Sequence, residues 1–346
     1  MTSAEAGPEV GPAHPASAGN SSGNDSSDIG RAYPREDGIR IVYIMGYGRS
    51  GSTLLDVMLG CHADITGVGE ISYLSEWLAD NKQCACHYSI RECDFWSRVF
   101  SESNLSLGEE SLSREVDRSV ESRRALPRLL AGRLPENMVA RYRRSQAALF
   151  AAVASVAENR VIVDSSKSVH RTDGRALALQ RYTDLDVRVI HLVRDARAVT
   201  WSALKGPGGS EKLGYTRVLP PLLRGLWVVA DWTITNLVCL VLARRLTPRS
   251  VIRVRYEDLV RNPRSELARI GAFVGVNLTD VSEMISLGQP LSPGHNVGGN
   301  RLTSTSAIRL KEDREWQDKL PWIYRGFYWL LAWPVAGRLG YRIGRR

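Results

Sequence analysis

The chain has 346 residues, of which 43% are apolar and 24% charged, a composition ordinary for a soluble globular protein with a substantial core. Its 46 Lys and Arg against 37 Asp and Glu leave a net charge of +9, which suits an anionic ligand or an acidic surface. Because no DNA- or RNA-binding signature accompanies this charge, we do not expect nucleic acid as a partner.

Residues 1–37 are poor in large apolar side chains and rich in Gly, Ser, Ala and Pro. Such a segment cannot bury enough surface to offset its ordering entropy, so the sequence predicts a disordered tail before a single domain over residues 38–346. The tail lacks the basic-then-apolar order of a signal peptide. The chain has 5 cysteines, an odd number spread too widely for a disulfide framework. We therefore expect a cytoplasmic protein.

Short runs of apolar, β-branched residues predict buried strands separated by helical stretches. These runs are Ile41–Met45, Val161–Val163, Val187–Val193 and Val251–Val254. Strands of this kind alternating with helices indicate a parallel sheet with helices on both faces. Residues 81–159 depart from the pattern, with Arg- and Ser-rich helical segments that predict a helical insertion or cap.

A glycine-rich loop, Gly46-Tyr-Gly-Arg-Ser-Gly-Ser-Thr53, directly follows the first strand. Strand, glycine turn and helix start form the frame of a P-loop, whose backbone N–H groups suit an anion. Ser52 stands where the pattern G-x-x-x-x-G-K-[ST] has its lysine, and Arg49 is the remaining cation. Without that lysine, hydrolysis of a nucleoside triphosphate loses a main electrostatic aid. The sequence thus predicts a P-loop-type three-layer α/β fold for a ligand less charged than a triphosphate with Mg²⁺.

The run GYGRSGSTLL resembles the 5′-phosphosulfate loop of the sulfotransferases, in which a basic residue two places before the last glycine meets the 5′-phosphate and sulfate. The next stretch, LLDVMLGCHADITGVGEISYL, resembles the loop, helix and "GE" turn of the protein-tyrosine and bacterial carbohydrate or small-molecule branch. The resemblance implies 3′-phosphoadenosine-5′-phosphosulfate (PAPS) as donor and Glu70 as catalytic base. It implies that the donor is bound by Gly48, Arg49, Ser50, Gly51, Ser52 and Thr53.

Three later segments resemble further parts of the same site. LVRDARAVTWS resembles the 3′-phosphate motif, which implies that Arg194 and Ser202 bind that phosphate, the arginine by charge-assisted hydrogen bonds. Lys167 follows the second predicted strand, where the family has a lysine that stabilises charge on the leaving phosphate. An alternative makes Ser165 or Ser166 a helix N-cap, which is compatible with that role. The segment His295–Arg301, HNVGGNR, resembles the late glycine-containing loop of the family, which implies Arg301 as another ligand of the 3′-phosphate.

Together these features predict in-line transfer of a sulfuryl group from PAPS to a hydroxyl or amine of a carbohydrate, lipid or small-molecule acceptor. Adenosine 3′,5′-bisphosphate (PAP) is the product, Glu70, Lys167 and Arg49 are the catalytic residues, and no metal is required. The alternatives are a degenerate P-loop kinase or NTPase and a non-catalytic nucleotide-binding protein on the same fold. Retention of Glu70 and Lys167 argues against a mere binder.

Cys84, Cys86 and Cys93 could supply three thiolates of a zinc site, with Cys61, His62 or His87 as the fourth ligand. No recognised four-ligand spacing is present, so packing or a regulatory disulfide is the preferred interpretation and no metal is expected.

Two apolar segments near the C-terminus raise the question of a membrane. The run Leu226–Ala243 is interrupted by polar residues, which predicts a buried helix rather than a membrane span. Residues 320–346 combine aromatic side chains with following arginines and could rest peripherally on a membrane surface. Packing of these aromatic residues on the protein is the favoured interpretation.

Overall fold

The computed structural model describes residues 38–103, 115–168, 170–205, 219–299, 308, 310 and 312–341. These residues belong to one unit, Pro34–Arg346, and only this unit is considered below. The predicted N-terminal tail and Arg301 lie outside the described residues, so both remain predictions.

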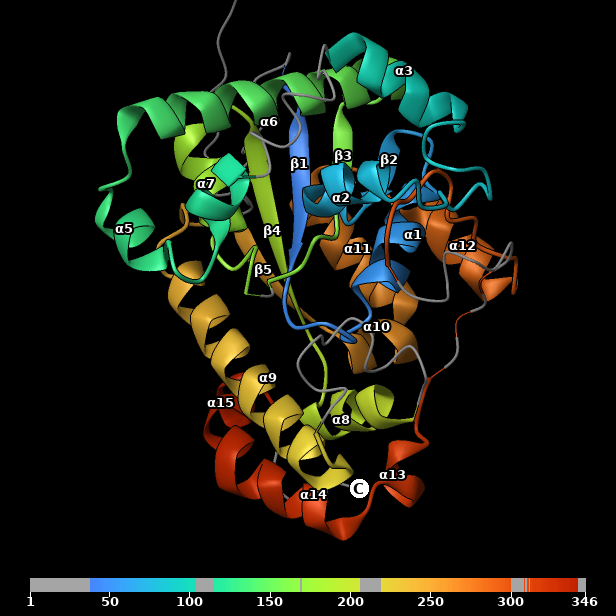
Figure 1. Ribbon diagram of the computed structural model, residues 1–346. Helices are drawn as coiled ribbons and strands as arrows, with labels where there is room; N and C mark the ends of the chain where they lie inside the picture. Colours follow the sequence, from blue (N-terminus) through green and yellow to red (C-terminus); the bar gives the residue numbers. More distant parts are fainter. Residues whose placement is uncertain are drawn as a thin grey trace, which may run out of the picture. The chain divides into compact units, whose positions relative to one another are not determined.

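A parallel sheet in the strand order β2-β3-β1-β4-β5 forms the middle layer (Figure 1). The strands are β1 Arg40–Met45, β2 Ile65–Gly69, β3 Val161–Asp164, β4 Asp186–Val193 and β5 Val251–Arg255. Four of them coincide within a residue or so with the predicted runs, and the α/β fold class is confirmed. The fifth, β2, was not predicted, because its sequence ITGVG is short and contains the strand-weakening glycine.

Side chains of β1 alternate between two hydrophobic cores, as the pleat of a strand requires. Ile41, Tyr43 and Met45 join one core, and Val42 and Ile44 join the other. The first core is covered mainly by α2 Leu74–Ala79, α3 Asp94–Ser103, α6 Glu136–Ala157 and α7 Arg175–Tyr182. The second is covered by α1 Ser52–Gly60, α10 Tyr256–Arg261, α11 Pro263–Val274 and α12 Thr279–Ser286. Helices thus cover both faces of the sheet.

The region 81–159 contains α3, α5 Leu126–Ala131 and α6. Phe150 and Val153 of α6 are fully buried in the same core as Ile41. The longest helix of the predicted insertion is therefore one of the layers that cover the sheet, and not only an appended cap.

Helix α9, Pro221–Ala243, contains the predicted apolar helix and extends it at its N-terminal end. By length and composition alone it could cross a membrane, and 44% of its most apolar window is buried inside the structure. The sequence predicted a helix that is buried as a whole, whereas in the structure only one face of α9 is buried. The polar interruptions Asp231 and Asn236 lie on this buried face, and Ile234 and Leu237 are about half exposed on the other.

The C-terminal helices lie beside α8 Ala196–Leu204 and α9 (Figure 1). They are α13 Trp316–Lys319, α14 Trp322–Phe327, the π-helical turn η4 Tyr328–Ala332 and α15 Trp333–Arg338. Side chains of η4 and α15 join those of α8 and α9 in a third core, whereas α13 has no buried residue. Tyr324 and Tyr328 are buried, in agreement with packing, whereas Trp322 is 81% exposed. A Cβ on Gly225 of α9 would overlap the Tyr324 ring, so this glycine permits the close approach of α14.

Candidate active site

The loop between β1 and α1 needs glycine at two of its positions. Gly46 has φ 147° and Gly51 has φ 94°, both in the region that favours glycine. A Cβ on Gly46 would overlap the Leu192 carbonyl oxygen, and one on Gly51 would overlap the Tyr256 ring. Because Gly51 is the N-cap of α1, the unpaired amides of the first helical turn open onto this loop.

Polar groups in the loop are buried and available to a ligand. Ser50, Ser52 and Thr53 are each at most 4% exposed. Within the described ranges, the Ser50 hydroxyl has no hydrogen-bond partner. A buried hydroxyl without a partner is costly, and a phosphate or sulfate oxygen would satisfy it. Gly48 has open space around its Cα, which lets a ligand approach the backbone.

Arg194 directly follows β4 and reaches back to the loop. Its Nη1 donates to the Arg49 carbonyl at 3.1 Å, and its Nη2 donates to Asp313 at 3.3 Å. The guanidinium carbon lies 4.3 Å from the centroid of the Tyr256 ring, a cation–π contact. In the part of the chain that the structure describes, its buried Nε has no partner. Arg194 therefore lies beside the loop with a donor left over for an anion.

Glu70 and Lys167 form an ion pair at the ends of β2 and β3. The ammonium group of Lys167 donates to Glu70 Oε1, and the Gly299 amide donates to the same oxygen at 3.0 Å. The two side chains are only 10% and 14% exposed, so water screens the pair weakly. A carboxylate and an ammonium are thus held together at the carboxyl edge of the sheet.

Main-chain bonds join this pair to the loop. The Ser168 amide donates to the Gly46 carbonyl, and the Ser165 amide donates to the Gly69 carbonyl, both at 2.9 Å. Lys167 has φ 67°, a strained conformation for a residue with a side chain, and its carbonyl accepts from Thr172 Oγ1 at 2.7 Å. The loop, the Glu70 carboxylate and the Lys167 ammonium therefore belong to one hydrogen-bonded edge of the sheet.

Asp56 of α1 supports the segment that carries Glu70. Its Oδ2 accepts from the Gly69 amide at 3.1 Å, and the side chain is fully buried. Burial raises the pKa of Asp56, and the nearby side chains of Ser165 and Asn296 and the Gly69 amide lower it, which leaves it at about 7. The Asp56 carboxyl group, which contacts the last residue of β2, therefore gains or loses its proton close to neutral pH.

Comparison with known proteins decides the family of this site. The sequence profile described as the sulfotransferase family matches residues 42–280, more than half of the chain. The chain belongs to the sulfotransferase family.

Individual relatives are more distant. Human carbohydrate sulfotransferase 6 is 29% identical over 151 residues, which are 40% of this chain and 37% of that protein. Human carbohydrate sulfotransferase 5 is 32% identical over 146 residues, 36% of this chain and 34% of the relative. The chain therefore matches well under half the length of these relatives. The sulfotransferase domain from the curacin biosynthetic pathway superposes with a TM-score of 0.53 at 19% identity, covering 90% of this chain and 100% of that one, which shows the fold.

Of the remaining predicted residues of this sulfotransferase, Ser202 lies in the second turn of α8, half-buried, on the helix that begins beside Arg194. Arg301 is outside the described ranges. The N-cap alternative for Ser165 or Ser166 is wrong, because the helix that follows, α7, begins only at Arg175 after the N-cap Gly174. Ser166 Oγ accepts instead from the Ser72 amide at 3.0 Å.

Several neighbours of the sulfotransferase site were not found from the sequence. Lys205 Nζ lies 3.1 Å from Asp313 Oδ2, so the carboxylate that pairs with Arg194 also pairs with a second cation. Gly299 holds Glu70 from 229 positions away along the chain. Asp313 and Lys205 belong to no recognised motif. The contact of Gly299 uses its backbone amide, which every residue except proline has, so the sequence gives no indication of it. Tyr256 could have been found, because it follows the predicted strand that became β5 and begins α10.

Proposed function

We propose that this sulfotransferase transfers a sulfuryl group from PAPS to a hydroxyl or amine, releasing PAP. The observation that supports this most is the Glu70–Lys167 pair, joined through Ser168 to the loop at Gly46. A nucleotide binder needs phosphate ligands only, whereas group transfer to a hydroxyl also needs a base and a stabiliser of the leaving group. A loop without the P-loop lysine disfavours a kinase or NTPase.

The donor site is proposed to hold phosphate groups at two places. The backbone amides from Gly48 to Thr53, the α1 N-terminus, Arg49 and the Ser50 hydroxyl would bind the 5′-phosphosulfate. Arg194 would bind the 3′-phosphate through its unpartnered Nε, with Ser202 and Arg301 as further ligands. Bound there, PAPS supplies a sulfuryl group on a phosphate leaving group.

Glu70 and Lys167 are proposed to divide the remaining work. Glu70 takes the proton from the acceptor, because a carboxylate at this edge can act as general base. Lys167 and Arg49 stabilise the negative charge that grows on the departing 5′-phosphate. The Gly299 amide keeps Glu70 oriented when Lys167 turns from the carboxylate toward the leaving oxygen. The transfer itself requires no metal in this scheme.

The acceptor is proposed to be a carbohydrate, with a lipid or other small hydroxyl compound as a wider class and no role for nucleic acid. The names of the relatives, carbohydrate sulfotransferases 5 and 6, support this choice. A pocket begins at Ile71 and Ser72, next to Glu70, and its lining combines the polar residues Ser75, Ser145 and Gln146 with the apolar residues Leu74, Leu78, Phe100 and Leu149. Its hydroxyl and amide groups could form hydrogen bonds with a polyol.

Incubation with sulfur-labelled PAPS and pools of carbohydrate, lipid and small-molecule acceptors tests the proposal. The parent should label an acceptor, and Glu70→Gln should lower turnover by about 10²- to 10⁴-fold while keeping the hydrogen bond from Gly299. Glu76→Gln, on α2 and paired with Arg118 and Arg171, is the matched control and should keep parental turnover. Undiminished turnover in Glu70→Gln would remove Glu70 from the mechanism.

Two further expectations stay proposals. We propose a cytoplasmic location, with which the free state of all 5 cysteines is consistent. Peripheral membrane contact through residues 320–346 is supported by the exposure of Trp322 and Trp333.

A further inference from the structure

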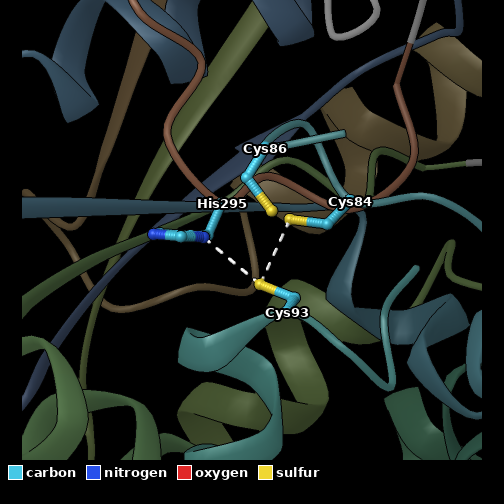
Figure 2. A group of neighbouring side chains, drawn as sticks. All are labelled: Cys84, Cys86, Cys93 and His295. Atoms are coloured by element: carbon cyan, nitrogen blue, oxygen red, sulfur yellow. Dashed lines mark hydrogen bonds between the residues drawn. The ribbon is translucent and has the colours of Figure 1, made fainter. Parts of the chain in front are cut away.

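Four potential metal ligands converge at one point between the Cys84–Cys93 segment and a distant loop (Figure 2). They are Cys84, Cys86, Cys93 and His295, and their ligand atoms all lie within 4.8 Å of one another. The Sγ atoms of Cys84 and Cys93 are 3.7 Å apart, and Cys93 Sγ is 3.3 Å from His295 Nδ1. Within the described residues, this is the group of side chains best suited to a metal ion.

These separations match a tetrahedral zinc ion. Zinc binds thiolate sulfur at about 2.3 Å and imidazole nitrogen at about 2.0–2.1 Å, so tetrahedral ligands stand about 3.8 Å apart for two sulfurs and about 3.6 Å for sulfur and nitrogen. The two distances from Cys93 Sγ, 3.7 Å to Cys84 Sγ and 3.3 Å to His295 Nδ1, agree with these values to within a few tenths of an ångström. Thiolates and imidazole also favour zinc over magnesium or calcium, which prefer oxygen.

We propose that Cys84, Cys86, Cys93 and His295 bind a structural zinc ion. Four protein ligands close the coordination sphere, which is the arrangement of structural rather than catalytic zinc sites. Each thiol that binds loses its proton to solvent, and no oxidant is needed. The sequence alone pointed to three of these ligands and named Cys61, His62 or His87 as the fourth. The structure corrects that choice to His295, 202 positions from Cys93.

The ligands are presented by segments already held in place. The Cys84 amide donates to the Tyr88 carbonyl at 2.9 Å, which closes the turn that carries Cys84 and Cys86. Cys93 immediately precedes α3. The rejected residues lie elsewhere: His62 is within 3.9 Å of Asp64 and 3.8 Å of Asp280, and His87 is exposed.

His295 is also docked by contacts that need no metal. Its ring stacks on Phe95 with centroids 5.1 Å apart and 12° between the planes. Its carbonyl accepts from Trp96 Nε1 at 2.7 Å, and the Asn296 carbonyl accepts from the Ala85 amide at 3.0 Å. The ring of His295 is thus held by its stacking on Phe95, and its backbone is held by the hydrogen bonds to the carbonyls of His295 and Asn296. A side chain fixed in this way loses little conformational entropy when it binds a metal, which favours binding.

A zinc ion here would fix the segment that holds Glu70. Two residues after His295, the Val297 carbonyl accepts from the Glu70 amide at 2.7 Å. Two residues further on, the Gly299 amide donates to Glu70 Oε1. The metal is thus a positioning element for the general base. This consequence rests on the proposed function, whereas the metal site itself does not.

A disulfide is the competing arrangement of these cysteines. It would require a sulfur–sulfur distance of about 2.0 Å and an oxidant, and it would leave one cysteine and the histidine without a function. The Cys84–Cys93 separation of 3.7 Å is that of two ligands of one ion.

Zinc content of the full chain tests the proposal directly. The protein is purified from zinc-supplemented cells, dialysed against metal-free buffer and analysed by plasma mass spectrometry, and about one zinc ion per chain is expected. Cys93→Ser and His295→Ala should lose the ion. Cys61→Ser removes a partly exposed cysteine outside the cluster and should retain it. Retention of zinc by Cys93→Ser and His295→Ala, or no zinc in the parent, would overturn the proposal.

Cobalt substitution keeps the proposal testable if the variants do not fold. The parent, stripped with a chelator and titrated with Co²⁺, should develop the intense visible bands of tetrahedral thiolate-bound cobalt, and their absence counts against the site. Denatured without reductant but with chelator, the chain should show all 5 thiols free, whereas a disulfide would remove two of them and overturn the proposal. Neither measurement uses sulfuryl transfer, so the metal site and the reaction can fail separately.

Discussion

At the scale of single residues, Arg194, the proposed ligand of the 3′-phosphate, is held in place by contacts that need no phosphate. The Arg49 carbonyl, Asp313 and the face of Tyr256 fix its guanidinium plane. Only the buried Nε is left without a partner among the described residues. Asp313 also forms an ion pair with Lys205. Its carboxylate therefore holds the two cations Arg194 and Lys205 close together, where both could interact with a phosphate.

Replacement of Arg194 by Ala should therefore weaken PAP binding by about 10- to 100-fold, because hydrogen bonds to charged groups contribute about 1.5–3 kcal/mol. Calorimetric titration of PAP measures the dissociation constant. Arg188→Ala is the control, since Arg188 is on the same strand and pairs with Asp186 at the other end. An unchanged affinity in Arg194→Ala would place the 3′-phosphate elsewhere.

The sequence predicted part of this site and missed part for a physical reason. Lys167 was expected at the carboxyl edge of the sheet because it follows a predicted buried strand, whereas Glu70 was assigned from the family resemblance alone, since β2 was not predicted. Gly299 and His295 could not be placed, because their loop returns to the sheet by hydrogen bonds between backbone atoms. Such contacts depend on the path of the chain and not on residue type.

At the scale of elements, β4 and α9 meet through a buried polar pair. The Nε2 atom of His191 in β4 lies 3.2 Å from Oδ1 of Asn236 in α9. Burial lowers the pKa of His191 to about 4, the bond to Asn236 raises it, and Arg253 of β5 lowers it. Between about pH 6.5 and about pH 4, the unfolded chain binds a proton at this histidine and the folded chain does not, so stability falls as the pH falls through that range.

His191→Gln should remove this acid sensitivity while its amide still reaches Asn236. Between about pH 7 and about pH 5, the free energy of unfolding of the parent should fall by about 2 kcal/mol more than that of the variant. Urea unfolding at both pH values measures the difference. An identical pH dependence in parent and variant would mean that His191 is protonated in the folded protein.

The elements themselves were predictable to different degrees. Long buried strands such as β4 are apolar throughout, so composition suffices to find them. The short strand β2 carries glycines that its surroundings require: a Cβ on Gly69 would overlap the backbone of Val297. Helix α9 buries the polar residues Asp231, Thr235 and Asn236 together with apolar ones and leaves Ile234 and Leu237 about half exposed, which periodicity alone does not predict.

At the scale of the whole molecule, the order β2-β3-β1-β4-β5 collects the site from distant parts of the chain. Because β1 lies between β3 and β4, its loop is flanked by Lys167 on one side and Arg194 on the other. Glu70 follows one strand further out. Crevices outside the carboxyl ends of such strands are where open α/β sheets bind ligands, and the residues of both proposed phosphate sites and the proposed base lie at that edge.

One titration tests this account most directly: binding of PAP without any divalent metal, against binding of ATP with Mg²⁺, measured by calorimetry on the full chain. The account predicts that PAP binds and that ATP with Mg²⁺ does not, because the loop has Ser52 in place of the P-loop lysine and Arg194 provides a second phosphate site. Binding of ATP with Mg²⁺ together with no binding of PAP would contradict it.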